Sequence, residues 1–350
     1  MTLPQKNYLL TLDSIRERCN QVYSKAQGQQ LEYFDIDESK LANVIDHVES
    51  VTKRRFSDLS VIPPHSRLRH FSGLDGLQQQ WQGVERKEQA RRLIDLVVVS
   101  VLLDAGAGQA WKYQTTDNRA VGRSEGLAIA SQDMFMQGYF SSAKEIPDRV
   151  DDFLDQYIVD DTVSIDHLWE AVMSLGGMWS GRIEIDGVQL GDVWPCTCLQ
   201  DKGNHENLVP FHKLSQWLTY SLVESLEISL GIKVVGTEKL TGLPEYRNGG
   251  LLIDHGLLKL KPAQVQRGTE HGEEFPTFDG GDPLIVEWRA LTVVYMDIIH
   301  KGLEKKVGQS LALAQVLEGG TWTAGREVAA KLRPDLAGPP IVTKSDGTLF

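Results

Sequence analysis

The chain has 350 residues, of which 41% are hydrophobic, so it is long enough to bury a large core as one domain or two. Its formal net charge of −12 argues against general binding to nucleic acid or to an anionic membrane, but does not exclude a local basic pocket. Three cysteines are too few for a disulfide framework and their number is odd, so we expect a protein of the reducing cytoplasm.

We expect neither a membrane span nor a secretory signal. The longest apolar run, residues 93–103, is interrupted by Asp95 and Ser100 and is shorter than the roughly 20 residues that cross a bilayer. The beginning of the sequence lacks the basic-then-apolar order of a secretory signal.

The N-terminal part, residues 1–160, is predicted to be mostly helical. Asp37 or Ser39 is suited to cap a helix with an apolar face and a basic C-terminal end, where the helix dipole favours cations. Apolar periodicity predicts further helices at residues 85–103, 124–137, 147–157 and 164–174.

A basic segment, VIPPHSRLRHFSGLD, occupies residues 61–75. Its paired prolines forbid a helix across them and hold His65, Arg67, Arg69 and His70 in a short, stiff stretch. So many basic side chains within an acidic chain make a candidate clamp for an anion. The alternative is a surface loop that makes scattered ion pairs.

The stretch LLDAGAGQAW, residues 102–111, contains two closely spaced glycines. Gly106 and Gly108 allow a sharp turn, or the start of a helix whose free N–H groups face a ligand. The stretch matches neither the dinucleotide fingerprint GxGxxG nor the Walker loop with its GK[ST]. Asp104, just before the turn, is suited either to cap a helix or to hold a ligand hydroxyl.

Strand patterns begin around RIEIDGVQLGDVW, where the apolar period changes to two and Asp186-Gly187 indicates a hairpin turn. A second β element is expected at residues 250–261. Residues 267–282 are rich in Gly, Glu, Pro and Asp, and we expect a mobile loop there, with a lid as one interpretation.

Helices are predicted again from residue 283 to 303 and at residues 323–332. The predicted fold class is therefore mainly α with small β-hairpins (α+β). We expect a single large domain, residues 1–350. The alternative is a division into a helical part, residues 1–178, and a helical part with hairpins, residues 179–350.

The helix predicted at residues 208–231 carries a dense set of chemically active side chains. Pro210 is suited to its first turn and Gly231 to its end. One face is apolar, and the polar and aromatic groups beside it are His212, Lys213, Gln216, Trp217 and Tyr220. These groups suit a polar small molecule with an anionic group. The alternative is an ordinary core helix with a polar edge.

The segment LTGLPEYRNGG, residues 240–250, places four polar side chains between a proline and two glycines. Glu245 is suited to bind sugar hydroxyls, and Arg247 to bind a phosphate in bidentate fashion, with Tyr246 and Asn248 beside them. The alternative is a polar turn between a strand and a hairpin.

Residues 280–299, GGDPLIVEWRALTVVYMDII, place a carboxylate on an apolar helix face. Asp282 followed by Pro283 is a good helix start. Glu287 shares its face with leucine, valine and isoleucine, and a carboxylate in such surroundings must be paired, protonated or functional. A site glutamate and a structural ion pair fit equally well, and Arg289 points elsewhere on the helix.

A metal site is a further alternative. Cys196, Cys198, His205 and His212 offer four soft or borderline ligands in the spacing C-x-C-x6-H-x6-H, although C-x-C is less usual than C-x2-C. A serine hydrolase is less favoured, because the sequence contains no GxSxG elbow.

Several segments resemble a known family: HSRLRHF, LLDAGAG, VPFHKLSQWLTYSL, LTGLPEYRNGG, VEWRALTV and GTWTAGRE are similar to segments of the uracil catabolism protein 4 family of fungi and bacteria. That family was long classed as a domain of unknown function. HKLSQ and EWR also resemble the Lys-x-x-Gln and acid-aromatic-Arg motifs of the queuosine-nucleotide salvage glycosidases, whose helical fold is related to that of DNA glycosylases. This second resemblance implies a helical body of that kind.

Together the resemblances imply a hydrolase that cleaves the N-glycosidic bond of ribosylurea, or of its 5′-phosphate, and releases urea without a cofactor. The first family belongs to a pathway that converts uracil to its nucleotide, opens the ring and releases urea. The alternatives are a metal-dependent amidohydrolase that attacks the urea group, and a non-catalytic nucleotide-binding protein of the same pathway. The expected partner is a small ribosyl substrate, with no nucleic acid and no membrane; the oligomeric state is left open.

The transition state of such a reaction resembles an oxocarbenium ion and requires a nearby carboxylate. We expect Glu287 in that role, with Glu245 holding ribose hydroxyls or exchanging roles with it. The phosphate candidates are Lys213, Arg247 and Arg289, with Arg67 and Arg69 in reserve.

For the rest of the substrate, His212 and Gln216 are expected to bind the urea group, and Trp217 or Trp111 to flank the sugar. The remaining substrate-binding candidates are His70, Asp104, Tyr246 and Asn248.

Overall fold

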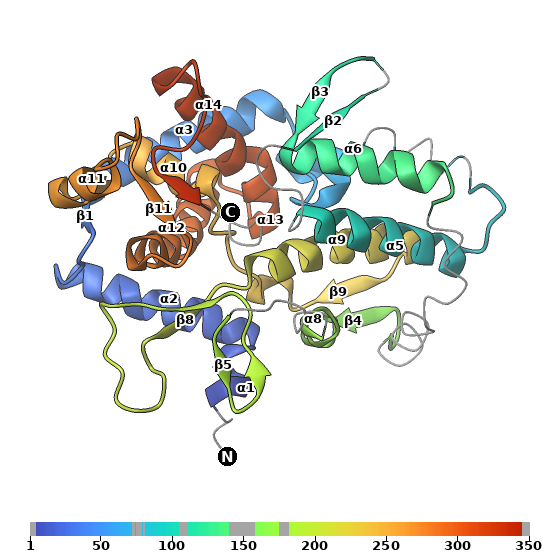
Figure 1. Ribbon diagram of the computed structural model, residues 1–350. Helices are drawn as coiled ribbons and strands as arrows, with labels where there is room; N and C mark the ends of the chain where they lie inside the picture. Colours follow the sequence, from blue (N-terminus) through green and yellow to red (C-terminus); the bar gives the residue numbers. More distant parts are fainter. Residues whose placement is uncertain are drawn as a thin grey trace.

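The computed structural model describes residues 5–71, 74, 79, 81–104, 111–115, 117–139, 158–174 and 182–344. Within these ranges the protein is mainly α-helical and its strands form small two-stranded sheets, which confirms the predicted fold class (Figure 1). The helix predicted at residues 147–157 and the glycines at 106 and 108 lie outside the described residues. None of the described helices is long and apolar enough to cross a bilayer.

The helices predicted at residues 85–103, 124–137, 164–174, 283–303 and 323–332 are confirmed with small shifts of their ends. The described α-helices are α1 (Gln5–Leu9), α2 (Leu12–Gln27), α3 (Leu41–Arg55), α5 (Arg86–Asp104), α6 (Arg123–Met136), α8 (Ile165–Met173), α9 (Lys213–Leu230), α10 (Tyr246–Asp254), α11 (Pro262–Gly268), α12 (Pro283–Val307), α13 (Leu313–Val316) and α14 (Trp322–Leu332). Of these, α10, α11 and α13 were not predicted. The shorter helical turns are η1 (Glu38–Lys40), η2 (Leu59–Val61), η3 (Arg67–His70), η5 (Thr237–Lys239) and the π-helical η6 (Leu317–Thr321).

Each described strand pairs with a single partner. The antiparallel pairs are β1 (Phe34–Ile36) with β10 (Leu258–Leu260), β2 (Lys112–Gln114) with β3 (Ala120–Gly122), β5 (Glu184–Ile185) with β6 (Val188–Gln189), and β7 (Val193–Pro195) with β8 (Leu208–Pro210). The parallel pairs are β4 (Thr162–Ser164) with β9 (Lys233–Val235), and β11 (Thr277–Asp279) with β12 (Val342–Lys344). The predicted turn at Asp186-Gly187 is confirmed, since both residues have positive φ, 49° and 77°.

Two long helices organise the core. The helix α12 is buried along most of its length and packs against α2 and α3, while α9 packs against α5 (Figure 1). The α12 start is as predicted: the Asp282 side chain accepts the Leu284 N–H at 2.9 Å, and Pro283 occupies the first turn. The C-terminal segment brings α14 against α10, and this contact shapes the site described below.

The beginning of α9 differs from the prediction. Pro210 lies in β8, paired with Val193, and the helix starts only at Lys213. The chain turns sharply at His212, which has a φ of 45°. Gly231 ends the helix with a φ of 72°, as predicted. The strand pairing with β7, distant in sequence from β8, overrides the helical pattern in the first residues of the segment.

Two further predictions need correction. Residues 246–254 form the helix α10, so the β element expected at residues 250–261 is limited to the strand β10. The region 267–282 contains the end of α11 and the strand β11, rather than loop alone. Both errors arise because a short helix and a short strand depend on packing partners elsewhere in the chain.

Candidate functional site

Four elements bring charged side chains together inside the protein. The turn η3 carries Arg67, the end of α5 carries Asp104, the start of α9 carries Lys213, and Glu245 precedes α10. All four residues lie in segments that are predicted from the sequence to contribute to a site. Each faces at least one of the others, as the contacts below show.

Arg67 and Asp104 form a buried ion pair. The Arg67 guanidinium donates to an Asp104 carboxylate oxygen and to the backbone carbonyls of Ser100 and Ser124, at 3.1 and 2.7 Å. The Ser124 hydroxyl donates to the same Asp104 oxygen at 2.9 Å. The other oxygen, Oδ1, is buried and has no hydrogen-bond partner among the described residues. Asp104 therefore keeps one acceptor for a further donor.

Lys213 is a partly buried ammonium in the first turn of α9. Burial lowers its pKa below the ordinary value, whereas the carboxylates of Asp104 and Glu245 act in the opposite direction. The ammonium therefore lies within electrostatic range of both carboxylates. This arrangement combines a cation with two carboxylates in a region shielded from water.

Glu245 caps α10. Its carboxylate accepts the backbone N–H groups of Arg247 at 3.0 Å and Asn248 at 2.5 Å, and the residue is only 7% exposed. A carboxylate at this position satisfies N–H groups of the first helical turn and interacts favourably with the helix dipole. The capping bonds fix the carboxylate in place, close enough to Lys213 to affect its titration.

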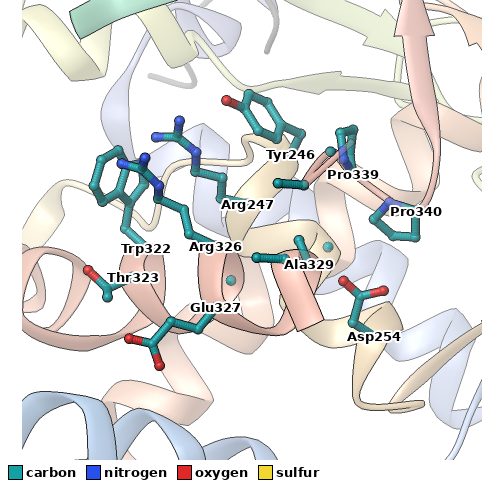
Figure 2. Close-up of a pocket in the computed structure, with 15 residues that line it drawn as sticks. Tyr246, Arg247, Asp254, Trp322, Thr323, Arg326, Glu327, Ala329, Pro339 and Pro340 are labelled. Carbon is teal, nitrogen blue, oxygen red and sulfur yellow. The ribbon is translucent and has the colours of Figure 1, made fainter. Parts of the chain in front are cut away.

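Arg247 lies over an indole ring at the mouth of a cavity. Its guanidinium is 4.2 Å from the centroid of the Trp322 ring and 5.2 Å from that of Tyr246, and no described carboxylate pairs with it. All three residues line a cavity of about 520 Å³ between α10 and α14. Figure 2 shows Arg247, Arg326 and Trp322 gathered on one side of this cavity, with Pro339 and Pro340 on the other.

Two histidines contact two tryptophans beside the charged groups. The His65 ring lies 4.7 Å from Trp217 and 5.9 Å from Trp322, and the His70 ring lies 6.0 and 5.9 Å from the same two rings. His65 Nδ1 is 2.8 Å from the Glu318 carboxylate. The His70 Nδ1 atom is buried and has no hydrogen-bond partner among the described residues. The Arg67 guanidinium lies 5.9 Å from the centroid of the Trp217 ring.

The sequence predicts no site role for Trp322 or Glu318, and it includes His65 only in the candidate anion clamp. Trp322 lies in GTWTAGRE, a segment that carries a family resemblance but no pattern typical of a site. Glu318 and His65 are buried and contact each other across a sequence separation of 253 residues, which periodicity does not reveal.

Glu287 lies elsewhere on the buried side of α12. Its carboxylate accepts three backbone N–H groups at the start of β1, from Glu32 at 3.2 Å and from Tyr33 and Phe34 at 3.1 Å each. Burial raises the pKa of Glu287 to about 7, and these three hydrogen bonds oppose the shift. These contacts give Glu287 a structural task, the anchoring of the segment that leads into β1.

Arg289 and His212 also make contacts within the fold. Arg289 forms two hydrogen bonds with Asp192 and lies over the Phe211 ring, 4.1 Å from its centroid. The His212 Nε2 atom is 2.8 Å from the Leu9 carbonyl oxygen, and burial lowers the pKa of this imidazole.

The remaining predicted residues are distributed as follows. Gln216 bonds Thr241 and the Phe211 carbonyl, and Asn248 donates to the Leu243 carbonyl at 3.0 Å. Arg69 pairs with Glu224 on α9, and Trp111 stacks on Tyr113 with ring centroids 6.4 Å apart. The structure therefore brings together Arg67, His70, Asp104, Lys213, Trp217, Glu245, Tyr246 and Arg247.

The cysteine pair does not gather a larger set of metal ligands. Cys196 and Cys198 have their sulfur atoms 3.3 Å apart, but His212 bonds Leu9 and His205 is exposed with a φ of 58°. In the described ranges no group of three or more His, Cys, Asp or Glu side chains is arranged to hold a metal ion.

The sequence is similar to known proteins along nearly its whole length. A protein family described as "Protein of unknown function (DUF1688)" matches residues 8–156 and 152–350. Protein urg3 of Schizosaccharomyces pombe is 38% identical, over 98% of this chain and 98% of that protein. Uracil catabolism protein 4 of Lachancea kluyveri is 35% identical, again over 98% of both chains. These matches confirm the family resemblance predicted from the short segments.

Proposed function

Because this chain belongs to the DUF1688 family, and a full-length relative is named for uracil catabolism, we propose that it acts in uracil catabolism as an N-glycosidase. The proposed reaction is the hydrolysis of ribosylurea, or of its 5′-phosphate, to urea and ribose or ribose phosphate. The weaker resemblance to the queuosine-nucleotide salvage glycosidases supports the same chemistry.

Glu245 is the carboxylate that we propose for the reacting centre. Cleavage of an N-glycosidic bond develops positive charge on the sugar, which a fixed carboxylate stabilises, and the same group can accept a proton from the attacking water. Glu245 is held by the two N–H groups of α10 and lies within electrostatic range of Lys213. Glu287 is less suited, because its carboxylate faces the start of β1 and, among the described residues, makes no hydrogen bond or ion pair with Asp104, Lys213 or Arg247.

Asp104 and Arg247 complete the proposed substrate contacts. The unpaired Oδ1 of Asp104 is suited to accept a ribose hydroxyl. Arg247 stacks on Trp322 beside the cavity and is without a carboxylate partner among the described residues, so its planar guanidinium is available for bidentate binding of a phosphate. Arg67 and Arg69 are already paired with Asp104 and Glu224, which makes them weaker candidates.

One observation carries the proposal: Glu245, Asp104 and Lys213 interact inside the protein, next to a cavity lined by Arg247 and Trp322. A partly buried ammonium near two carboxylates, and an aromatic and basic cavity lined by the two residues that follow Glu245, together suit a sugar phosphate.

The test is a product assay with purified protein, given ribosylurea and its 5′-phosphate in separate reactions. Stoichiometric urea and ribose or ribose phosphate are expected. Ammonia in place of urea, with loss of activity on chelation, would favour an amidohydrolase instead. Substrate binding without any product would favour a non-catalytic protein of the same pathway.

A further inference from the structure

His70 is an imidazole whose Nδ1 atom is buried and has no hydrogen-bond partner in the part of the chain that the structure describes. Its ring lies 6.0 Å from Trp217 and 5.9 Å from Trp322, the indole on which Arg247 stacks. Buried polar atoms in native proteins are nearly always hydrogen-bonded, so an exception at a candidate site needs an explanation. A substrate atom that completes the hydrogen bond provides one.

The surroundings of His70 keep its ring neutral. Burial lowers the pKa of His70 to about 3, and the neighbouring Arg67, His65 and Arg247 add to this effect, while Glu318 opposes it. A neutral imidazole carries one N–H donor. It can therefore donate a hydrogen bond without placing a positive charge next to a developing sugar cation.

We infer that His70 donates a hydrogen bond from Nδ1 to the carbonyl oxygen of the departing urea group. This inference rests on the proposed N-glycosidase function. As the C1′–N bond breaks, its electron pair stays on the ureido nitrogen and the negative charge spreads to the carbonyl oxygen. Water adds its oxygen to C1′ and gives one proton to Glu245, and that proton is then passed to the ureido nitrogen, so that urea leaves and Glu245 is again ionised. A donor fixed in place before the reaction stabilises this charge where it develops.

The other candidates for this role are already engaged. His65 Nδ1 contacts Glu318, His212 Nε2 contacts the Leu9 carbonyl, and the Gln216 amide bonds Thr241. Unlike these three residues, His70 has a buried ring nitrogen without a hydrogen-bond partner among the described residues. Its ring also contacts both Trp217 and Trp322.

The test compares two leaving groups in full-length protein. One substrate is ribosylurea and the other is 4-nitrophenyl β-D-ribofuranoside. Either both substrates carry a 5′-phosphate or both lack it, so that they differ only in the leaving group. His70→Phe keeps a ring between the indoles and removes the donor, whereas His70→Asn keeps an N–H near the Nδ1 position. His47→Asn, a histidine of α3 that contacts His255 at 2.9 Å, is the matched control.

We expect His70→Phe to lower kcat for ribosylurea by about 10²–10³-fold, the usual effect of removing one such donor. For the aryl riboside the decrease in kcat should stay within about threefold, because 4-nitrophenolate is a stable anion that leaves without a hydrogen-bond donor. His70→Asn should recover part of the ribosylurea activity, and His47→Asn should change neither rate.

Equal losses on both substrates, without recovery in His70→Asn, would mean that His70 only supports the fold, and would overturn the inference while the glycosidase function stands. If His70→Phe does not fold, His70→Ala replaces it in the same comparison. Failure of the wild-type protein to release urea from either substrate form would instead overturn the proposed function, and this inference with it.

Discussion

Arg289 and Asp192 form an interior ion pair with two parallel hydrogen bonds, Nη1 to Oδ1 at 2.8 Å and Nη2 to Oδ2 at 2.7 Å. Asp192 also accepts the backbone N–H of Lys213 at 3.0 Å. The pair therefore connects α12 with the segment before β7 and with the first turn of α9. Since that turn carries Lys213, the geometry of the candidate site depends on this connection.

Asp192→Asn is expected to destabilise the protein by about 3–5 kcal/mol, because it removes the carboxylate charge that both nitrogens of the buried Arg289 guanidinium contact. Burial raises the pKa of Asp192, but the Arg289 guanidinium outweighs this effect and holds the pKa at about 2. The stabilisation is therefore present at neutral pH and is lost as the pH falls from about 4 towards 2. Urea denaturation at several pH values measures it.

The matched control is Asp166→Asn, which removes the solvent-exposed pair with Lys239 at 2.6 Å. Exposed pairs contribute at most about 1 kcal/mol. Equal losses in the two variants would contradict the role given to the Arg289–Asp192 pair.

Glu287→Gln is expected to change how stability depends on pH. The pKa of Glu287 is raised by burial to about 7 from its ordinary value of 4.5, so the folded protein binds this proton more tightly than the unfolded chain. The contribution of Glu287 to the free energy of unfolding therefore falls as pH rises through this range, by an amount on the order of 3 kcal/mol.

In Glu287→Gln this contribution is absent, so the wild type should lose stability relative to the variant between about pH 4.5 and 7. Urea unfolding curves of both proteins at intervals across that range provide the measurement. If the difference in free energy of unfolding between the two proteins stays constant with pH, the expectation is refuted.

Glu245→Gln is expected to lower kcat for ribosylurea by about 10²–10³-fold with little change in KM, because the carboxylate acts on charge that develops in the transition state. The amide keeps an oxygen that can accept a capping hydrogen bond. Asp282→Asn is the matched control, since Asp282 caps α12 in the same manner away from the site. If Glu245→Gln keeps full activity and Glu287→Gln loses it, the catalytic carboxylate is Glu287.

Arg247→Met is expected to raise KM for ribosylurea 5′-phosphate by about 10–100-fold, which corresponds to a loss of roughly 1.4–2.8 kcal/mol of binding free energy. The KM for free ribosylurea should stay unchanged, because that substrate has no phosphate for Arg247 to bind. Arg326→Met is the control, because that guanidinium lies 4.9 Å from the same indole but pairs with Glu125 at 2.8 Å. Similar effects of the two variants, or an effect of Arg247→Met on both substrates, would argue against a phosphate contact.

Gly325→Ala is expected to separate α14 from α10 and to impair activity as well as stability. A Cβ atom at Gly325 would lie 2.3 Å from the Arg247 carbonyl oxygen, which as backbone cannot move aside cheaply. We expect a loss of about 1–3 kcal/mol, typical of overpacking. Gly28→Ala is the control, since its nearest neighbours would be 3.5 Å or more away. An active Gly325→Ala protein of wild-type stability would show that the helices tolerate the added methyl.

The sequence by itself determined most of the local structure. The helices α3, α5, α6, α8, α12 and α14 were predicted from apolar periodicity, and the start of α12, the end of α9 and the turn at 186–187 from their Asp-Pro, Gly and Asp-Gly residues. These features depend on hydrogen bonds and steric limits between neighbours in the chain, which the order of residues specifies directly.

Only the tertiary structure decided which charged groups meet. Glu287 finds its hydrogen-bond donors about 250 positions away, at Phe34 and its neighbours, whereas Glu245 comes to face Lys213. His70 lies between Trp217 and Trp322 because η3, α9 and α14 pack together. Such encounters follow from the packing of distant elements, and a residue's type and local spacing do not identify its partner.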